Sequence, residues 1–181
     1  MKKIVLSLIV VVLGLAAQAQ ITKVSLQASG LTCSMCSKAV LNALEKVPAV
    51  GKVQVDIKNQ QYNISFTDSA QPDFDALAAA VQDAGFAVAS FKVTANLEKT
   101  RLQKDQHVLI GGRYFHFLNA ANQELNGPTS FTIVDKAYTS AKTFKKYSGM
   151  STMECVQTGK TAKCCKSDEI KEETRIFHAI M

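Results

Sequence analysis

After residue 19 the sequence lacks any apolar run long enough to cross a membrane as a helix, which takes about 20 apolar residues. It also lacks a carboxylate pair, a phosphate-binding loop or a Ser/His/Asp arrangement at a convincing spacing, which argues against an enzyme. No arginine-rich stripe with interleaved aromatic residues favours nucleic-acid binding. The formal net charge is +6, to which Lys2 and Lys3 contribute two, and the other basic residues are scattered among acidic ones. That scatter is typical of a solvated surface.

Residues 1–19 predict a cleaved signal peptide. Lys2 and Lys3 precede an apolar run, Ile4 to Leu15, that is short for a membrane span, and Ala17-Gln18-Ala19 has the small-x-small pattern of a signal peptidase site. The residue directly after this pattern is Gln20 and not a cysteine, which argues against a lipid anchor. We therefore expect a secreted or periplasmic protein that is soluble after cleavage and has no stable membrane insertion. The alternative is an uncleaved N-terminal anchor.

The next 70 or so residues, about the length of a small domain, alternate between two periodicities. Apolar residues at every second position predict strands, and apolar residues at helical spacing predict helices. Pro48 ends the first helix, and Gly85 closes the second. The predicted order is strand 23–28, a helix ending before 48, strands 53–57 and 62–66, helix 72–85 and strand 87–93. This α+β order, βαββαβ, is that of the ferredoxin-like unit.

The most informative motif joins the first strand to the first helix. Cys33 and Cys36 are separated by two residues, so we expect Cys36 in the first turn of the helix and Cys33 in the loop before it. Unpaired N–H groups and a partial positive charge at a helix N-terminus favour the thiolate form of cysteine. Two thiolates facing one point predict a site for a soft metal ion.

With this motif in place, residues 22–93 resemble a heavy-metal-associated domain, the unit of copper chaperones and of the start of copper-transporting P-type ATPases. The family motif Gly-Met-Thr-Cys-x-x-Cys stands here as Gly30-Leu31-Thr32-Cys33-Ser34-Met35-Cys36. Leu31 replaces a methionine that packs beneath the loop. Family members carry lysine or an aromatic residue beside the site, just after the second helix, and Phe86 is of the aromatic kind.

The resemblance implies a non-enzymatic metal carrier or chaperone. Its expected cargo is Cu(I), held by Cys33 and Cys36, and the same pair accepts Zn(II), Cd(II) or Hg(II). The expected partner is a copper-transporting ATPase or another metal carrier. A thiol-disulfide oxidoreductase using the same cysteines is the alternative, but the aromatic-Cys-Gly-x-Cys context and the strand order of thioredoxins are both missing.

The remainder of the chain predicts a linker and a second module. Domain boundaries are set at residues 20–94 for the heavy-metal-associated domain, 95–106 for a polar linker, and 107–181 for a small β-rich C-terminal domain of no recognised family. Strands are expected at 108–110, 114–118, 131–134 and 175–180. A helix is expected between Asp135 as its cap and Gly149 as its stop, and the threonine and serine content of this segment leaves a strand as the alternative.

This C-terminal module holds the other three cysteines. Cys155, Cys164 and Cys165 lie near Met150 and Met153, and thiolates with thioethers select Cu(I), so these five residues are candidates for a second metal site. A disulfide from Cys155 to Cys164 or Cys165, favoured by an oxidising compartment, and free thiols remain as alternatives. Three histidines, His107, His116 and His178, fall in apolar surroundings and are expected to be structural rather than ligands.

Overall fold

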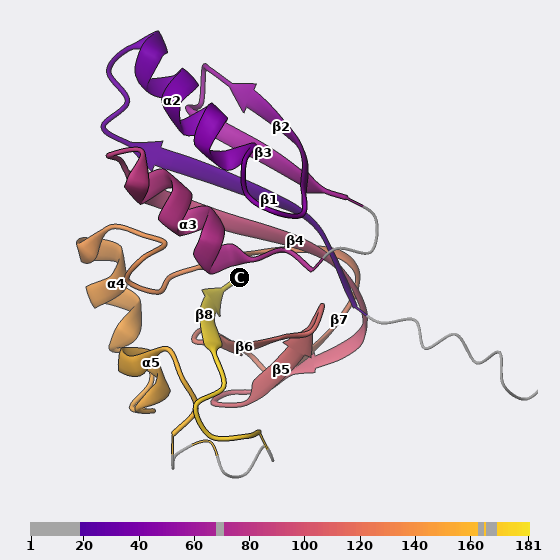
Figure 1. The fold of residues 1–181 in the computed structure, drawn as a ribbon. Coiled ribbons are helices and arrows are strands. Elements are labelled where there is room, and N and C mark those ends of the chain that lie inside the picture. Colours follow the sequence, from indigo (N-terminus) through magenta and orange to yellow (C-terminus); the bar gives the residue numbers. More distant parts are fainter. Residues whose placement is uncertain (1–18, 68–70, 163–164, 166–169) are drawn as a thin grey trace, which may run out of the picture.

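The computed structural model describes residues 19–67, 71–162, 165 and 170–181, so all but the last residue of the expected signal peptide lie outside it (Figure 1). In chain order the elements are β1 (Gln20–Ser29), α2 (Ser34–Leu44), β2 (Val50–Asp56), β3 (Gln61–Phe66), α3 (Phe74–Asp83), β4 (Ala87–Leu102), β5 (His107–Ile110), β6 (Arg113–Phe117), β7 (Gln123–Ile133), α4 (Ala141–Ser148), α5 (Cys155–Thr158) and β8 (Ile176–Ile180). No helix among the described residues is long and apolar enough to cross a membrane.

The first six elements confirm the βαββαβ order of the ferredoxin-like fold. Strand β1 lies between β3 and β4 and is antiparallel to both. Its alternating residues Val24, Leu26 and Ala28 are buried, as the periodicity predicts. Helix α3 begins where the Asp73 carboxylate accepts a hydrogen bond from the Ala76 N–H at 3.0 Å. The positions of the helices and strands therefore follow from local sequence signals.

All eight strands belong to one sheet, in the order β2-β3-β1-β4-β7-β8-β6-β5. Strand β4 is 16 residues long and pairs with β1 on one side and β7 on the other. The predicted linker at 95–106 is therefore wrong for residues 95–102, which extend β4. The reason is that Ala95 and Leu97 continue the buried face of β4 between polar neighbours. The register with β7 then shifts between Leu97 and Thr100, and Leu102 beyond the shift is buried again.

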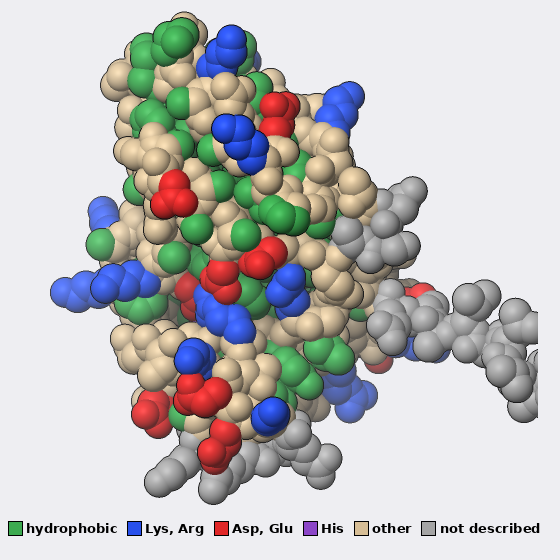
Figure 2. Space-filling view, in the orientation of Figure 1, with side chains coloured by type: hydrophobic (Ala, Val, Ile, Leu, Met, Phe, Trp, Pro, Cys, Tyr) green, Lys and Arg blue, Asp and Glu red, His purple; other side chains and the backbone are tan. Residues whose placement is uncertain are grey.

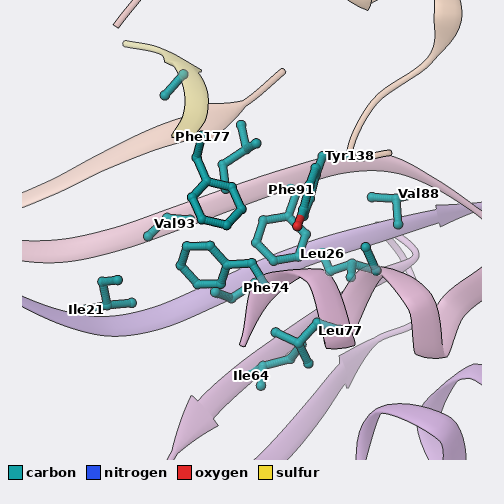
Figure 3. Packing of buried hydrophobic residues seen from close by; sticks show 14 of the residues in the cluster. Ile21, Leu26, Ile64, Phe74, Leu77, Val88, Phe91, Val93, Tyr138 and Phe177 are labelled. Atoms are coloured by element: carbon teal, nitrogen blue, oxygen red, sulfur yellow. The ribbon is translucent and has the colours of Figure 1, made fainter. Parts of the chain in front are cut away.

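An aromatic cluster joins the N-terminal and C-terminal halves (Figure 3). Phe74, at the start of α3, packs edge-on against Phe91 of β4 and Phe177 of β8, with ring centroids 5.4 and 5.3 Å apart. Tyr138 covers Phe91 at 4.9 Å. All four side chains are fully buried in the same core. The two halves therefore share one hydrophobic core as well as one sheet.

The C-terminal half contributes strands β5, β6, β7 and β8 to the sheet, and the helix expected there starts later than predicted. Helix α4 begins after Ser140, whose hydroxyl accepts a hydrogen bond from the Thr143 N–H, and it ends at Gly149 as expected. Asp135 is not a cap, because its carboxylate binds the backbone and side chain of His178. Helix α5 was not predicted.

A second, smaller apolar cluster lies beside α5, and its buried members are Leu118, Val134, Cys155, Val156 and Cys165. At the surface, on the face shown in Figure 2, basic and acidic side chains are interspersed, in agreement with the scatter seen in the sequence.

Candidate metal centre

The two motif cysteines lie at the surface, where β1 leads into α2. Cys33 is the N-cap of α2, with an extended backbone at φ −148° and ψ 162°, and its side chain is exposed. Cys36 lies in the first turn of the helix and is half-buried. This confirms the predicted local structure, in which the loop carries one thiol and the helix carries the other.

The Cys33 sulfur takes the place of the usual capping oxygen. The Cys36 N–H, one of the unpaired donors at the start of α2, donates a hydrogen bond to Cys33 Sγ at 3.2 Å. A separate interaction of the Cys36 thiol with the Cys33 side chain does most to lower the pKa of Cys36 from its usual 9.0. Burial raises this pKa, hydrogen bonds from the backbone of Thr32 and Cys33 lower it, and the net pKa is lowered. A lowered thiol pKa means more thiolate, which is the form that binds metal.

Three contacts hold the motif loop on the fold. Gly30 has φ +83°, in the left-handed region that favours glycine, and turns the chain out of β1. The buried Tyr62 donates its hydroxyl hydrogen to the Ser37 carbonyl at 3.1 Å, which fixes the first turn of α2. Leu31, the residue that departs from the family motif, packs against the core. The departure therefore preserves the loop's apolar anchor.

Phe86 lies against the base of this loop. The ring borders the loop at Gly30, because Phe86 Cδ1 lies 4.0 Å from the position that a Cβ at this glycine would occupy. Phe86 is half-buried and also packs against the core. The position agrees with an aromatic neighbour of the site that contributes no ligand atom.

This arrangement suits a soft ion that is bound and released at the surface. The donor set is two thiols on adjacent parts of a helix start, one of them exposed and one with a lowered pKa. Soft thiolate ligands prefer ions such as Cu(I). An exposed thiol leaves room for the thiolate of another molecule to attack the bound ion, so the geometry permits transfer by ligand exchange.

The candidates for a second site are only partly brought together. Cys155 and Cys165 are buried in the small apolar cluster, and Met153 packs against that cluster while half-buried. Met150 is 47% exposed, and Cys164 lies outside the described residues. The sequence analysis did not anticipate that His107 and His116 border Cys155, at 3.7 and 3.9 Å from its sulfur. By contrast, His178 has the expected structural role, with Nδ1 2.6 Å from Asp135 Oδ1.

One sequence signal could have paired the two histidines. Gly111-Gly112 is the turn of the β5–β6 hairpin, and a symmetric two-residue turn places residues at equal distances from it opposite each other. His107 and His116 are such a pair, and they are partners in the β5–β6 register. No comparable signal relates this hairpin to Cys155.

The fold and the dithiol loop define a metal-binding domain of the heavy-metal-associated class, and comparison with known proteins agrees. The model of the heavy-metal-associated domain matches residues 25–87. The mercuric transport protein periplasmic component of Serratia marcescens is 34% identical over 86 residues, which cover 48% of this chain and 93% of that protein. The chain therefore belongs to the heavy-metal-associated domain family, through its N-terminal half.

Two solved structures cover the same region. Oxidized MerP from Ralstonia metallidurans CH34 is 33% identical, with 38% of this chain and 94% of that chain covered and a TM-score of 0.35. The CopZ metallochaperone is 26% identical, with 38% and 100% covered and a TM-score of 0.34.

Proposed function

We propose that this protein is an exported carrier that binds a soft metal ion between Cys33 and Cys36 and passes it to a partner by ligand exchange. The observation that carries the proposal is the pair itself: an exposed thiol caps the helix in which the second thiol has a lowered pKa. Residues 20–94 carry this function, and it is stoichiometric, without catalytic turnover.

Cu(I) is the first cargo to test and Hg(II) is the second. Cu(I) follows from the motif and its resemblance to copper chaperones, and Hg(II) is supported by the name of the Serratia marcescens relative, a mercuric transport protein. Both ions are soft and favour thiolate ligands. The receiving partner is a copper-transporting ATPase or another metal carrier that offers thiolates of its own.

Export is supported by the lysine-flanked apolar run and the Ala17-Gln18-Ala19 pattern, and by the periplasmic location in the relative's name. If the signal is cleaved as proposed, the protein recovered from the cell envelope or the medium begins at Gln20. N-terminal sequencing of the purified protein tests this. An intact Met1 in exported protein would contradict cleavage.

The metal function is tested by competitive titration of anaerobically reduced protein with Cu(I), and separately with Hg(II), against a chromophoric chelator. The double variant Cys33→Ser/Cys36→Ser should lose one equivalent of the preferred ion. The matched control is Met35→Leu, which removes a thioether that is 72% exposed within the same motif and should bind as the parent does.

Retention of full stoichiometry and affinity for both ions by the double variant would refute the assignment. The alternative function makes a different prediction: a thiol-disulfide oxidoreductase should reduce a disulfide substrate with turnover that depends on the same pair. Turnover by metal-free protein, lost in the double variant, would favour that alternative.

A further inference from the structure

A second constellation of sulfur and nitrogen atoms lies in the C-terminal half, separate from the Cys33–Cys36 motif. It is made by His107 of β5, His116 of β6, Cys155 at the start of α5, and Cys165. His116, Cys155 and Cys165 are at most 1% exposed, whereas His107 is half-buried. The four residues come from three parts of the chain and converge beside the small apolar cluster.

His107, His116 and Cys155 are spaced like ligands around one ion, and Cys165 joins them through its distance to His107. His107 Nε2 lies 3.7 Å from Cys155 Sγ and 3.8 Å from Cys165 Sγ, and His116 Nδ1 lies 3.9 Å from Cys155 Sγ. The ligand atoms of His107, His116 and Cys155 all lie within 4.8 Å of one another. Around a tetrahedral zinc ion, with Zn–S of about 2.3 Å and Zn–N of about 2.1 Å, sulfur and nitrogen ligands lie about 3.6 Å apart.

An acidic side chain lies beside the ring nitrogen of His116 that faces away from Cys155. His116 Nε2 lies 3.5 Å from Asp105 Oδ1, and that carboxylate in turn accepts a hydrogen bond from the Ser151 hydroxyl at 2.8 Å. The tautomer that carries its proton on Nε2 would present the Nδ1 lone pair to Cys155. Ligand histidines commonly have a carboxylate near their second ring nitrogen.

We propose that Cys155, Cys165, His107 and His116 form a buried, tetrahedral Cys2His2 site for Zn²⁺ that stabilises the C-terminal half. Two thiolates and two imidazoles in a closed tetrahedral arrangement are the donor set typical of structural zinc. The apolar cluster there has five buried members among the described residues, of which Cys155 and Cys165 are two, and a metal that ties α5 and Cys165 to the β5–β6 hairpin adds a strong constraint.

The two sites then differ in role as well as in ligands. The N-terminal pair has one exposed thiol, which suits an ion that is passed on. The C-terminal group is buried and uses four ligands, which suits an ion that is retained. This second proposal does not depend on which ion Cys33 and Cys36 carry, since it stands on other residues.

The test uses full-length chain carrying Cys33→Ser/Cys36→Ser, so that uptake at the N-terminal motif does not contribute. Anaerobically reduced, metal-free protein is titrated with Co²⁺, whose visible spectrum reports tetrahedral geometry and sulfur ligation. We expect one equivalent with an intense tetrahedral spectrum, displaced by one equivalent of Zn²⁺. In this background His107→Ala, Cys155→Ser and Cys165→Ser should each lose that spectrum.

Controls separate the four ligands from their neighbours. Cys164→Ser and Met153→Leu should keep the spectrum and the stoichiometry. Asp105→Asn should lower zinc affinity by about 10- to 100-fold while the spectrum remains tetrahedral, which is the usual cost of losing a carboxylate that orients a ligand histidine. The charge-matched control is Glu98→Gln, an exposed acid on β4, which should bind zinc as the parent does.

The thermal midpoint provides a second readout, because buried Cys variants can fail to fold. Zinc should raise the midpoint of the background protein and leave that of His107→Ala, whose side chain is half-buried, unchanged. No zinc-dependent rise in the background protein, or an octahedral Co²⁺ spectrum, would overturn the proposal. A Cys155–Cys165 disulfide in protein isolated from cells would overturn it as well, since oxidised sulfurs do not bind zinc.

Discussion

Asp75 and Arg175 are 100 residues apart in the chain, yet the Arg175 guanidinium donates two hydrogen bonds, each of 3.2 Å, to the Asp75 carboxylate. Asp75 lies in the first turn of α3, in the metal-binding half, and Arg175 immediately precedes β8. The Tyr138 hydroxyl donates a third hydrogen bond to the same carboxylate at 2.5 Å. The Asp75 carboxylate therefore accepts three hydrogen bonds from two residues of the C-terminal half, and it ties that half to the start of α3.

This relationship predicts a pH-dependent contribution to stability. Burial raises the pKa of Asp75, but hydrogen bonds from Arg175 and Tyr138 and the charges of Arg175 and Arg113 outweigh it, so the net pKa lies below the usual 3.8. A lowered folded-state pKa stabilises the fold above the unfolded pKa, and that stability is lost as pH falls through the folded pKa. The contribution of the ionised Asp75 to the free energy of unfolding should therefore be constant near neutral pH.

Asp75→Asn should lower the free energy of unfolding by about 1 kcal/mol at pH 7, because the side chain is half exposed and solvent weakens the pair. The difference from the parent should shrink once the pH falls below 3.8. Urea unfolding across this range measures it. Asp83→Asn, an exposed acid at the end of α3, is the matched control and should show no such loss. A pH-independent difference would contradict the ionic origin.

Phe74 tests whether the shared core makes the chain unfold as one unit. Phe74→Ala removes a fully buried ring that contacts both Phe91 and Phe177, and such truncations cost about 3–5 kcal/mol. Because these contacts span both halves, the protein should unfold in a single transition whose midpoint in the variant lies at a lower denaturant concentration. Far-UV circular dichroism and tyrosine fluorescence should report the same midpoint. Two transitions, of which only one moves, would mean that the halves unfold independently.

Local signals in the sequence predicted the metal-binding half well, because each of its elements carries its own. Val24, Leu26 and Ala28 alternate, and Cys33 and Asp73 stand where helices begin. The predictions failed where tertiary contacts decide the outcome. Residues 95–102 look polar but extend β4 because one face packs on the core.

The Cys/His group of the C-terminal half illustrates the same limit. Cys155 is 48 residues from His107 in sequence. Nothing in the spacing of either residue relates the β5–β6 hairpin to α5. The sequence could indicate that cysteines and methionines cluster near residue 155, but it could not indicate that histidines would be their neighbours.

The lowered pKa of Cys36 predicts an effect on its reactivity. Cys33→Ala removes the sulfur that accepts the Cys36 N–H and that lowers the pKa of the Cys36 thiol most, so this pKa should rise toward 9.0. The rate of alkylation of Cys36, followed by mass spectrometry of its peptide across a pH series, should then reach half its maximum at a higher pH than in the parent. Met35→Leu should leave that midpoint in place. Equal midpoints in Cys33→Ala and the parent would exclude the interaction as the cause.

Phe86 predicts how fast the bound ion leaves. Its ring borders the loop at Gly30 and supplies no ligand atom, so Phe86→Ala should keep the metal stoichiometry. Transfer to a competing thiol chelator should accelerate, because less of the motif is shielded from an attacking thiolate; stopped-flow absorbance measures this rate. The matched control is Phe66→Ala, which truncates another half-buried ring. Phe66 lies at the end of β3, beside the start of β1, whereas the motif follows the end of β1. Equal acceleration in both variants would assign the effect to general loosening of the fold, and no acceleration in Phe86→Ala would remove this ring from the control of metal release.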